Sequence, residues 1–213
     1  MIEYLHALLL WLAVFLPSSG LGSLLAKRGK VLAGAGIQGA FLALSFVLIS
    51  LLGIPFGFGL AYIPQAVATG FSVSLALNFG EKLLSEKKNG EKAETLEFLP
   101  DGSLWKALLL LILAPLAEES LNRGLVEGYL LSHGQFWGAI LFSALLFAIP
   151  HVMAFERASA GEKAYVTAGA FVMGLIVGYL FAVSGSLLTA FAFHSSANLA
   201  GILMGELGSE RNR

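Results

Sequence analysis

The sequence contains no cysteine, and few of its residues are charged. The absence of cysteine excludes disulfide bonds, thiolate metal sites and a cysteine nucleophile. Charged residues make up 13% of the 213 residues, about half the share that is usual in a soluble domain. The formal net charge is −1 and no basic stripe runs along the chain, so we expect no nucleic-acid partner.

Hydrophobic residues, by contrast, are abundant. They make up 57% of the chain, and the mean hydropathy is +0.80. This composition indicates a polytopic membrane protein with the lipid bilayer as its surroundings. The first ten residues, "MIEYLHALLL", carry an acidic residue and no basic one, and they lack a small-residue cleavage site. We therefore expect them to begin the first transmembrane span and not to form a signal peptide.

Long apolar stretches set the expected architecture, because a helix needs about 20 apolar residues to cross the bilayer. Seven stretches qualify, and we predict an all-α polytopic membrane protein, a bundle of about seven to eight transmembrane helices around an intramembrane polar cavity. A polar stretch at 81–103 divides the chain into an N-terminal three-helix portion with a cytoplasmic loop, 1–103, and a C-terminal core, 104–213. The apolar stretches are 5–25, 31–53, 58–80, 104–132, 135–153, 165–183 and 186–206.

The basic residues predict the orientation in the membrane. In the seven-span arrangement, twelve of the 13 lysines and arginines fall in connections on one side or in the C-terminal tail. Cytoplasmic loops carry an excess of lysine and arginine, so we expect the N-terminus outside and the C-terminus in the cytoplasm. These residues are Lys27, Arg28, Lys30, Lys82, Lys87, Lys88, Lys92, Lys106, Arg157, Lys163, Arg211 and Arg213.

The thirteenth basic residue, Arg123, lies inside the fourth apolar stretch together with Glu118 and Glu119. Ionisable groups are costly within a membrane and by default indicate function. Glu119 and Arg123 are four residues apart, with the acid first, which favours an ion pair. Glu118 points about 100° away on a helix and stays free to exchange a proton as a general base. A purely structural Glu119–Arg123 ion pair is the alternative.

Two later stretches supply complementary side chains. "LLFAIPHVM" places Phe147 and His151 four residues apart, with Pro150 just before the histidine. "FAFHSSANLAG" places His194 and Asn198 on one helical face. Taken singly, a histidine or asparagine in a span is also explained as an interhelical hydrogen bond. We interpret the other polar residues in or near spans as structural, namely His6, Gln38, Gln65, Asn78, Glu127 and His133.

Three motifs in order carry a resemblance to a known family. Glu118-Glu119-x-x-x-Arg123 with Gly124, then Phe147-x-x-x-His151, then His194-x-x-x-Asn198 resemble those of the CPBP intramembrane protease family. That family contains the Rce1-like type II CAAX prenyl endopeptidases and bacteriocin-processing Abi proteins. The resemblance covers about residues 104–206, and the first three stretches carry no motif of it. Ser120, Leu121 and Asn122 stand where family members often have an aromatic residue.

The resemblance implies an endopeptidase and assigns catalytic roles. Glu118 with His151 would activate a water molecule for attack on a peptide carbonyl. His194 and Asn198 would stabilise the oxyanion that forms.

Supporting roles and a substrate class follow from the same resemblance. Arg123 would position Glu119, which supports the site, and Phe147 would pack beside His151. The substrate would be a prenylated or membrane-associated peptide or protein. The sequence itself shows no prenyl pocket.

Zinc is the alternative to a water activated without metal. Glu118, His151 and His194 would hold the ion if the enzyme were metal-dependent. The sequence has no HExxH, and Asn198 is a poor zinc ligand but a good oxyanion donor. We therefore expect no cofactor and no metal.

Two other functions remain open from the sequence. A transporter or proton-coupled channel also uses intramembrane ionisable residues, but it would more often show inverted repeats, which this chain lacks. A non-catalytic scaffold or immunity protein of the same fold is the third alternative.

Finally, Pro115 predicts an irregular fourth span. Its start near Leu104 would place Glu118 about 21 Å along the helix, whereas His151 would lie near the cytoplasmic end of the fifth span. We therefore predict a kink or break between Leu113 and Ala117.

Overall fold

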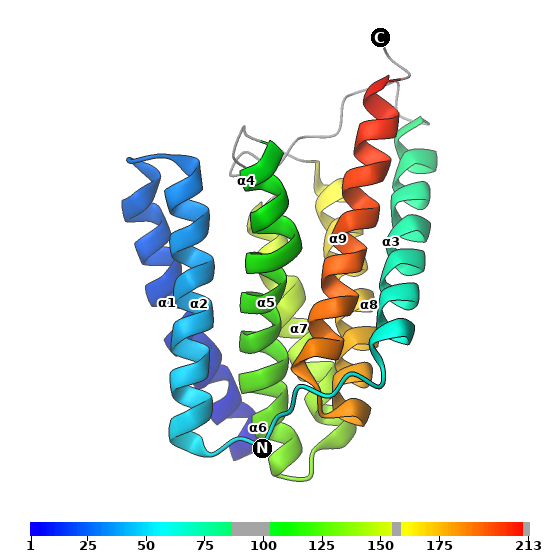
Figure 1. Ribbon diagram of the computed structural model, residues 1–213. Helices are drawn as coiled ribbons and strands as arrows, with labels where there is room; N and C mark the ends of the chain where they lie inside the picture. The colour runs from blue at the N-terminus through cyan, green and yellow to red at the C-terminus, as the bar shows by residue number, and fades with distance from the viewer. Residues whose placement is uncertain (87–102, 155–158, 211–213) are drawn as a thin grey trace.

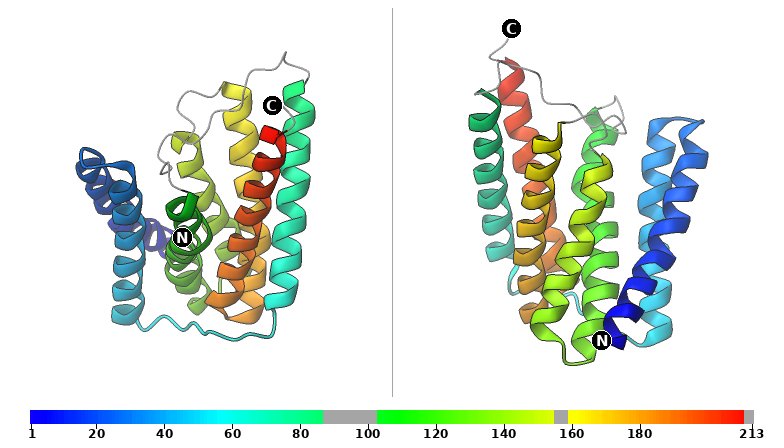
Figure 2. Two further views of the ribbon diagram at one scale, coloured as in Figure 1. Left: turned by 45° about the horizontal axis from the view of Figure 1, so that its top comes forward. Right: turned by 180° about the vertical axis from the view of Figure 1, so that it is seen from behind.

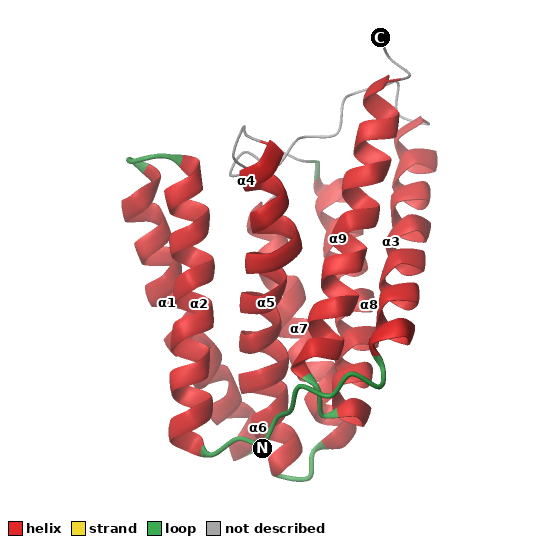
Figure 3. Cartoon of the chain, in the orientation of Figure 1, coloured by secondary structure: helices red, strands yellow, loops and turns green. Residues whose placement is uncertain are grey.

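The chain is almost entirely helical. A computed structural model describes residues 1–86, 103–154 and 159–210, and their regular structure is helical apart from one isolated β-bridge (Figures 1 and 3). This confirms the predicted all-α class. The polar stretch 87–102 and the predicted loop residues Lys87, Lys88, Lys92, Arg157, Arg211 and Arg213 lie outside the described residues.

Six long helices and one composite helical run make up the described fold. Each apolar stretch predicted from the sequence falls on one of them, because hydrophobic runs of this length form continuous helices. The long helices are α1 (Ile2–Ala26), α2 (Lys30–Leu52), α3 (Ile63–Glu86), α7 (Phe136–Ala154), α8 (Ala160–Ser184) and α9 (Leu187–Glu210). The composite run comprises α4 (Ser103–Leu108), the π-helical segment η1 (Leu109–Leu113), α5 (Ala114–Glu119), the π-helical segment η2 (Ser120–Glu127) and α6 (Gly128–Ser132).

The helices run up and down side by side. The α1–α2 hairpin packs on one side of the composite run, and α3 pairs with α9 on the other (Figures 1 and 2). The segment 53–62 crosses below the bundle from α2 to α3 (Figure 1). There the Gly57 N–H donates to Gly185 O over 2.7 Å and the Leu187 N–H donates to Gly57 O over 2.9 Å. The crossing segment is thereby tied to the α8–α9 turn.

Among the described residues, four helices are long and apolar enough to cross a membrane, as expected of an integral membrane protein. They span Ile2–Ala26, Lys30–Leu52, Ala160–Ser184 and Leu187–Met204, and Phe136–Val152 is a shorter apolar helix. The run from Ser103 to Ser132 is not among them, because it is divided by π-helical segments and carries charged residues. The total of seven to eight spans stays a prediction.

The predicted break near Pro115 is absent. The chain stays helical from Ser103 to Ser132, and the irregularity takes the form of η1, which ends directly before Ala114. The Ala114 N–H bonds to Leu109 O, five residues back, and Pro115 has no N–H to donate. The predicted break was wrong because neighbouring side chains and local π-helical turns can satisfy the carbonyls that a proline frees in a membrane helix, and the kink stays a prediction.

Two glycines lie where the main chains of neighbouring helices approach closely. A Cβ on Gly70 of α3 would lie 2.3 Å from the main-chain oxygen of Phe193 in α9. A Cβ on Gly174 of α8 would lie 3.0 Å from the Cα of Ala144 in α7. Small residues permit close backbone approach of this kind between membrane helices. Helix α3 thus packs closely on α9, and α8 packs closely on α7.

Candidate active site

The adjacent glutamates of the composite run have different surroundings. The Glu119 side chain is fully buried, whereas the Glu118 side chain is 24% exposed. They stand at the end of α5, directly before η2. π-Helical turns occur often at functional sites. The structure therefore separates one accessible carboxylate from one enclosed carboxylate.

Glu119 joins the composite run to α9. Its Oε2 lies 3.2 Å from Nε of Arg123, the predicted ion pair, and both side chains have no exposed surface. Its Oε1 accepts a hydrogen bond from His194 Nδ1 over 2.7 Å. A buried carboxylate that has both an arginine and a histidine as partners is held in one orientation.

Arg123 is the centre of a buried polar network. Its Nη1 donates to Ser143 Oγ of α7 over 3.3 Å, and its Nη2 donates to Gly174 O of α8 over 3.2 Å. Its Nε lies 3.9 Å from Oε2 of Glu127, which also accepts from Ser143 Oγ over 2.9 Å. One guanidinium thus links three elements of the core, and its charge faces two fully buried carboxylates.

Phe147 of α7 packs among the charged side chains. The guanidinium carbon of Arg123 lies 5.0 Å from the centre of its ring. Its ring centre lies 5.1 Å from that of His151 and 5.6 Å from that of His194. The predicted contact between Phe147 and His151 is present, and the same ring contacts the second histidine as well. A cation over an aromatic face gains electrostatic stabilisation when water is excluded.

Hydrogen-bond partners fix the histidine ring nitrogens. His151 Nδ1 lies 3.0 Å from Phe147 O, and a carbonyl oxygen only accepts, so this nitrogen carries the proton. His194 Nδ1 faces the Glu119 carboxylate in the same way. In its neutral form, each ring therefore presents an unprotonated Nε2 to its surroundings.

The second nitrogen of the His194 ring, Nε2, faces the accessible glutamate, Glu118. His194 Nε2 lies 4.0 Å from Glu118 Oε2. The other carboxylate oxygen, Oε1, accepts a hydrogen bond from Gln38 Nε2 of α2 over 3.0 Å. His151 is close enough to Glu118 for an electrostatic interaction between the two side chains. Side chains from α2, α7 and α9 thus surround the Glu118 carboxylate of α5.

Asn198 and Ser195 cap the carbonyls that the π-helical turn leaves free. The Asn198 amide donates to Leu110 O over 2.8 Å, and Ser195 Oγ donates to Leu111 O over 2.6 Å. Leu111 O is the acceptor that the missing N–H of Pro115 would otherwise have reached. One N–H of the Asn198 amide is therefore engaged with the backbone, and the second is left for another acceptor.

The described residues do not form a metal centre in this arrangement. No three histidine, cysteine, aspartate or glutamate side chains of the described ranges come together as a metal-binding group. Glu119, which could add a carboxylate ligand, is engaged with His194 and Arg123. The set Glu118, His151 and His194 therefore does not supply the three converging ligands that a catalytic zinc needs.

Four residues of the site lay outside the sequence-based assignment. Gln38 and Glu127 were interpreted as structural, and Ser143 and Ser195 were not singled out. The spacing of Glu127 from Arg123, four residues on one helical face, is a signal that indicates the second carboxylate. Nothing local predicts the contact of Gln38, which lies 80 residues from Glu118 along the chain.

Comparison with known proteins identifies the C-terminal part of the chain. The family model described as type II CAAX prenyl endopeptidase Rce1-like matches residues 100–200, which contain all three predicted motifs. Neither curated proteins nor solved structures gave a match. The matched segment carries the paired glutamates, both histidines and Asn198, and lies in a bundle of apolar helices. Residues 100–200 of the chain are therefore similar to the Rce1-like family, which is a family of proteases.

Proposed function

We propose that the protein is an intramembrane endopeptidase in which Glu118 activates the attacking water. The observation that supports this is the separation of 4.0 Å between Glu118 Oε2 and His194 Nε2. A water molecule hydrogen-bonded to both atoms at about 2.8 Å fits such a separation. Of the two adjacent glutamates, Glu118 is the accessible one, and a base that acts on a substrate must be accessible.

The general base acts with a histidine. Glu118 Oε2 takes a proton from the water molecule while the water oxygen attacks the peptide carbonyl. His151, whose Nδ1 proton is held by Phe147 O, faces this chemistry through Nε2, and we assign it to activation of the same water. The proton is then delivered to the leaving nitrogen, so that the base returns to its starting form.

The oxyanion is stabilised from α9. His194 and Asn198 lie four residues apart on one helical face, and Asn198 keeps an amide N–H beyond the one bound to Leu110 O. His194 donates to the oxyanion from Nε2 as an imidazolium that has taken its second proton from solvent before the attack, because Nδ1 is committed to Glu119. Donors aimed at a developing negative charge act strongly where water is excluded. Glu119, held by Arg123, keeps the His194 ring in place.

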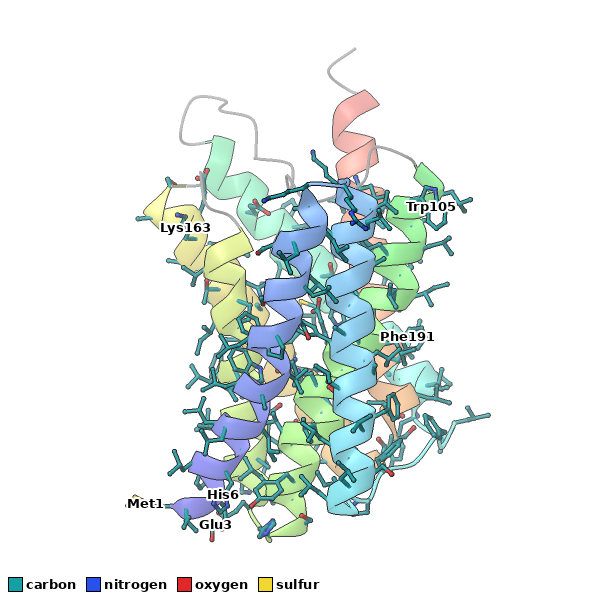
Figure 4. All side chains as sticks on the ribbon, turned by 90° about the vertical axis from the view of Figure 1, so that its left-hand side faces the viewer. Met1, Glu3, His6, Trp105, Lys163 and Phe191 are labelled. Atoms are coloured by element: carbon teal, nitrogen blue, oxygen red, sulfur yellow. The ribbon has the colours of Figure 1, made fainter. Side chains whose placement is uncertain are left out.

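The substrate class follows from the family match and from the position of the site. Members of the Rce1-like family are described as type II CAAX prenyl endopeptidases, so a prenylated or membrane-associated peptide is the substrate that we propose. Two basic residues bear on the orientation in the membrane. Lys106 lies in α4 and Lys163 lies near the start of α8, and Lys163 is at the end of the bundle opposite Met1 (Figure 4). This favours an external N-terminus and a cytoplasmic C-terminus.

A reconstituted assay tests the proposal. The full chain in liposomes is mixed with an internally quenched, farnesylated peptide that ends in a CAAX sequence. We expect cleavage by the wild type and a loss of about a hundredfold to ten-thousandfold in Glu118→Gln, the usual contribution of a general base. Glu3→Gln, a change beside Met1 at one end of the bundle, serves as the control (Figure 4). Full cleavage by Glu118→Gln would remove the basis of the proposal.

A further inference from the structure

Helix α2, which lies outside the family match, contributes a polar side chain to the site. It packs against α5 and η2. Its buried face carries Gly34, Phe41, Ser45 and Ile49, and Gln38 lies on this face between the first two. A Cβ on Gly34 would stand 3.0 Å from the Leu109 side chain, so the two helices approach closely one turn from Gln38. The approach places the Gln38 amide within reach of the composite run.

The hydrogen bond from Gln38 distinguishes the two oxygens of Glu118. Gln38 Nε2 donates to Oε1 over 3.0 Å, while Oε2 faces His194 Nε2. The carboxylate only accepts, so the amide must turn its nitrogen toward it. With Oε1 engaged, Oε2 is the oxygen left for a water molecule.

A neutral donor suits this position in a membrane. An arginine or lysine facing Glu118 would neutralise the base and would need partners of its own in lipid. An amide N–H favours the ionised carboxylate and fixes its rotamer without adding a charge. At Glu119, whose carboxylate is fully buried, the partner that fixes the carboxylate is the charged side chain of Arg123.

We infer that Gln38 is a positioning residue for the proposed general base, and that α2 is therefore part of the catalytic assembly. The inference rests on the proposed function of Glu118. Gln38 touches neither the water nor the substrate, and it acts by holding the Glu118 carboxylate in one rotamer through the hydrogen bond to Oε1. A hydrogen bond that only joins two helices would instead affect stability and leave the rate of the chemical step unchanged.

The test uses Gln38→Met, which keeps the length of the side chain and removes the donor. With the farnesylated peptide as substrate, kcat should fall about tenfold to a hundredfold, as expected for loss of a hydrogen bond to a charged group, while KM stays within about twofold. Gln38→Asn keeps an amide on a shorter side chain and should lose less. Ser45→Ala, a change at a buried α2 hydroxyl that has no hydrogen-bond partner among the described residues, is the matched control and should keep the wild-type kcat.

The outcomes separate the two claims. Cleavage that requires Glu118 but proceeds at the wild-type kcat in Gln38→Met would overturn the role of Gln38 alone. A lower kcat in Ser45→Ala equal to that of Gln38→Met would also overturn it, because any disturbance of α2 would then suffice. Absence of any Glu118-dependent cleavage by the wild type would overturn the proposed function and the role of Gln38 together.

Discussion

His194 of α9 donates its Nδ1 proton to Glu119 Oε1 over 2.7 Å, and this hydrogen bond joins two of the three family motifs. Because Nδ1 is held there, the Nε2 atom is turned toward Glu118, 4.0 Å away. The fully buried glutamate thus orients the histidine, and the accessible glutamate is the one that we propose as the general base. Second partners that fix the ring orientation of a histidine in this way are common in catalytic sites.

Arg123 should be the most sensitive position for folding. Arg123→Met leaves the buried carboxylates of Glu119 and Glu127 without their cation, and removing one partner of a buried pair costs about 3–5 kcal/mol. The free energy of unfolding, measured with denaturant in detergent micelles, should fall by this amount. Arg28→Met, at the exposed α1–α2 turn, should leave it unchanged. A stable, folded Arg123→Met protein would contradict the network described above.

Ser195 should matter because of Pro115. Ser195→Ala leaves Leu111 O without its donor, and an unsatisfied buried carbonyl costs about 1–3 kcal/mol. Pro115→Ala restores a main-chain N–H that can bond to the freed carbonyls. The destabilisation by Ser195→Ala should therefore be smaller in the Pro115→Ala background, and a double-mutant cycle of unfolding free energies measures the difference. Strictly additive effects would show that the two residues act independently.

Much of the fold was predictable, since apolar runs of membrane length form helices regardless of their partners. The paired glutamates, Arg123 and the two histidines were also predictable, because charges in lipid require a function or a partner. The way in which the structure accommodates Pro115 was not predictable. Its freed carbonyls are capped by Ser195 and Asn198, more than 80 residues away, and no local pattern shows that a distant helix will supply those donors.

The role of Gln38 escaped prediction for a related reason. A single amide in an apolar helix is equally consistent with many interhelical hydrogen bonds. What distinguishes Gln38 is the packing of α2 on α5, together with the close approach of Gly34 to the Leu109 side chain. The total of seven to eight spans stays a prediction, because four helices among the described residues have the length and hydropathy of a membrane span.

Gly70 should tolerate no side chain. The Cβ of Gly70→Ala would lie 2.3 Å from Phe193 O, which is main chain and cannot rotate away, so α3 must move from α9. Overpacking of this kind costs about 1–3 kcal/mol or more, and the apparent Tm in detergent should fall. Gly39→Ala, where a Cβ meets nothing within 4 Å, is the matched control and should not lower Tm. Equal Tm values for the two variants would contradict the close packing of α3 on α9.

Chelation should leave cleavage unchanged. The described residues do not bring three metal ligands together, and the proposed mechanism uses carboxylate, imidazole and amide groups alone. Dialysis of the reconstituted protein against a chelator should therefore preserve the rate of cleavage of the farnesylated peptide. Loss of that rate, followed by its return on addition of zinc, would replace the proposed mechanism with a metal-dependent one.

The central claim is tested most directly by comparing protein termini in host membranes that contain the wild type or Glu118→Gln, because this comparison assumes no substrate. The account predicts new termini that appear only with the wild type and that mark the cleaved bond. Equal expression and a similar Tm for the two proteins would attribute the difference to chemistry. Identical sets of termini from the two folded proteins would contradict the assignment of Glu118 as the catalytic base.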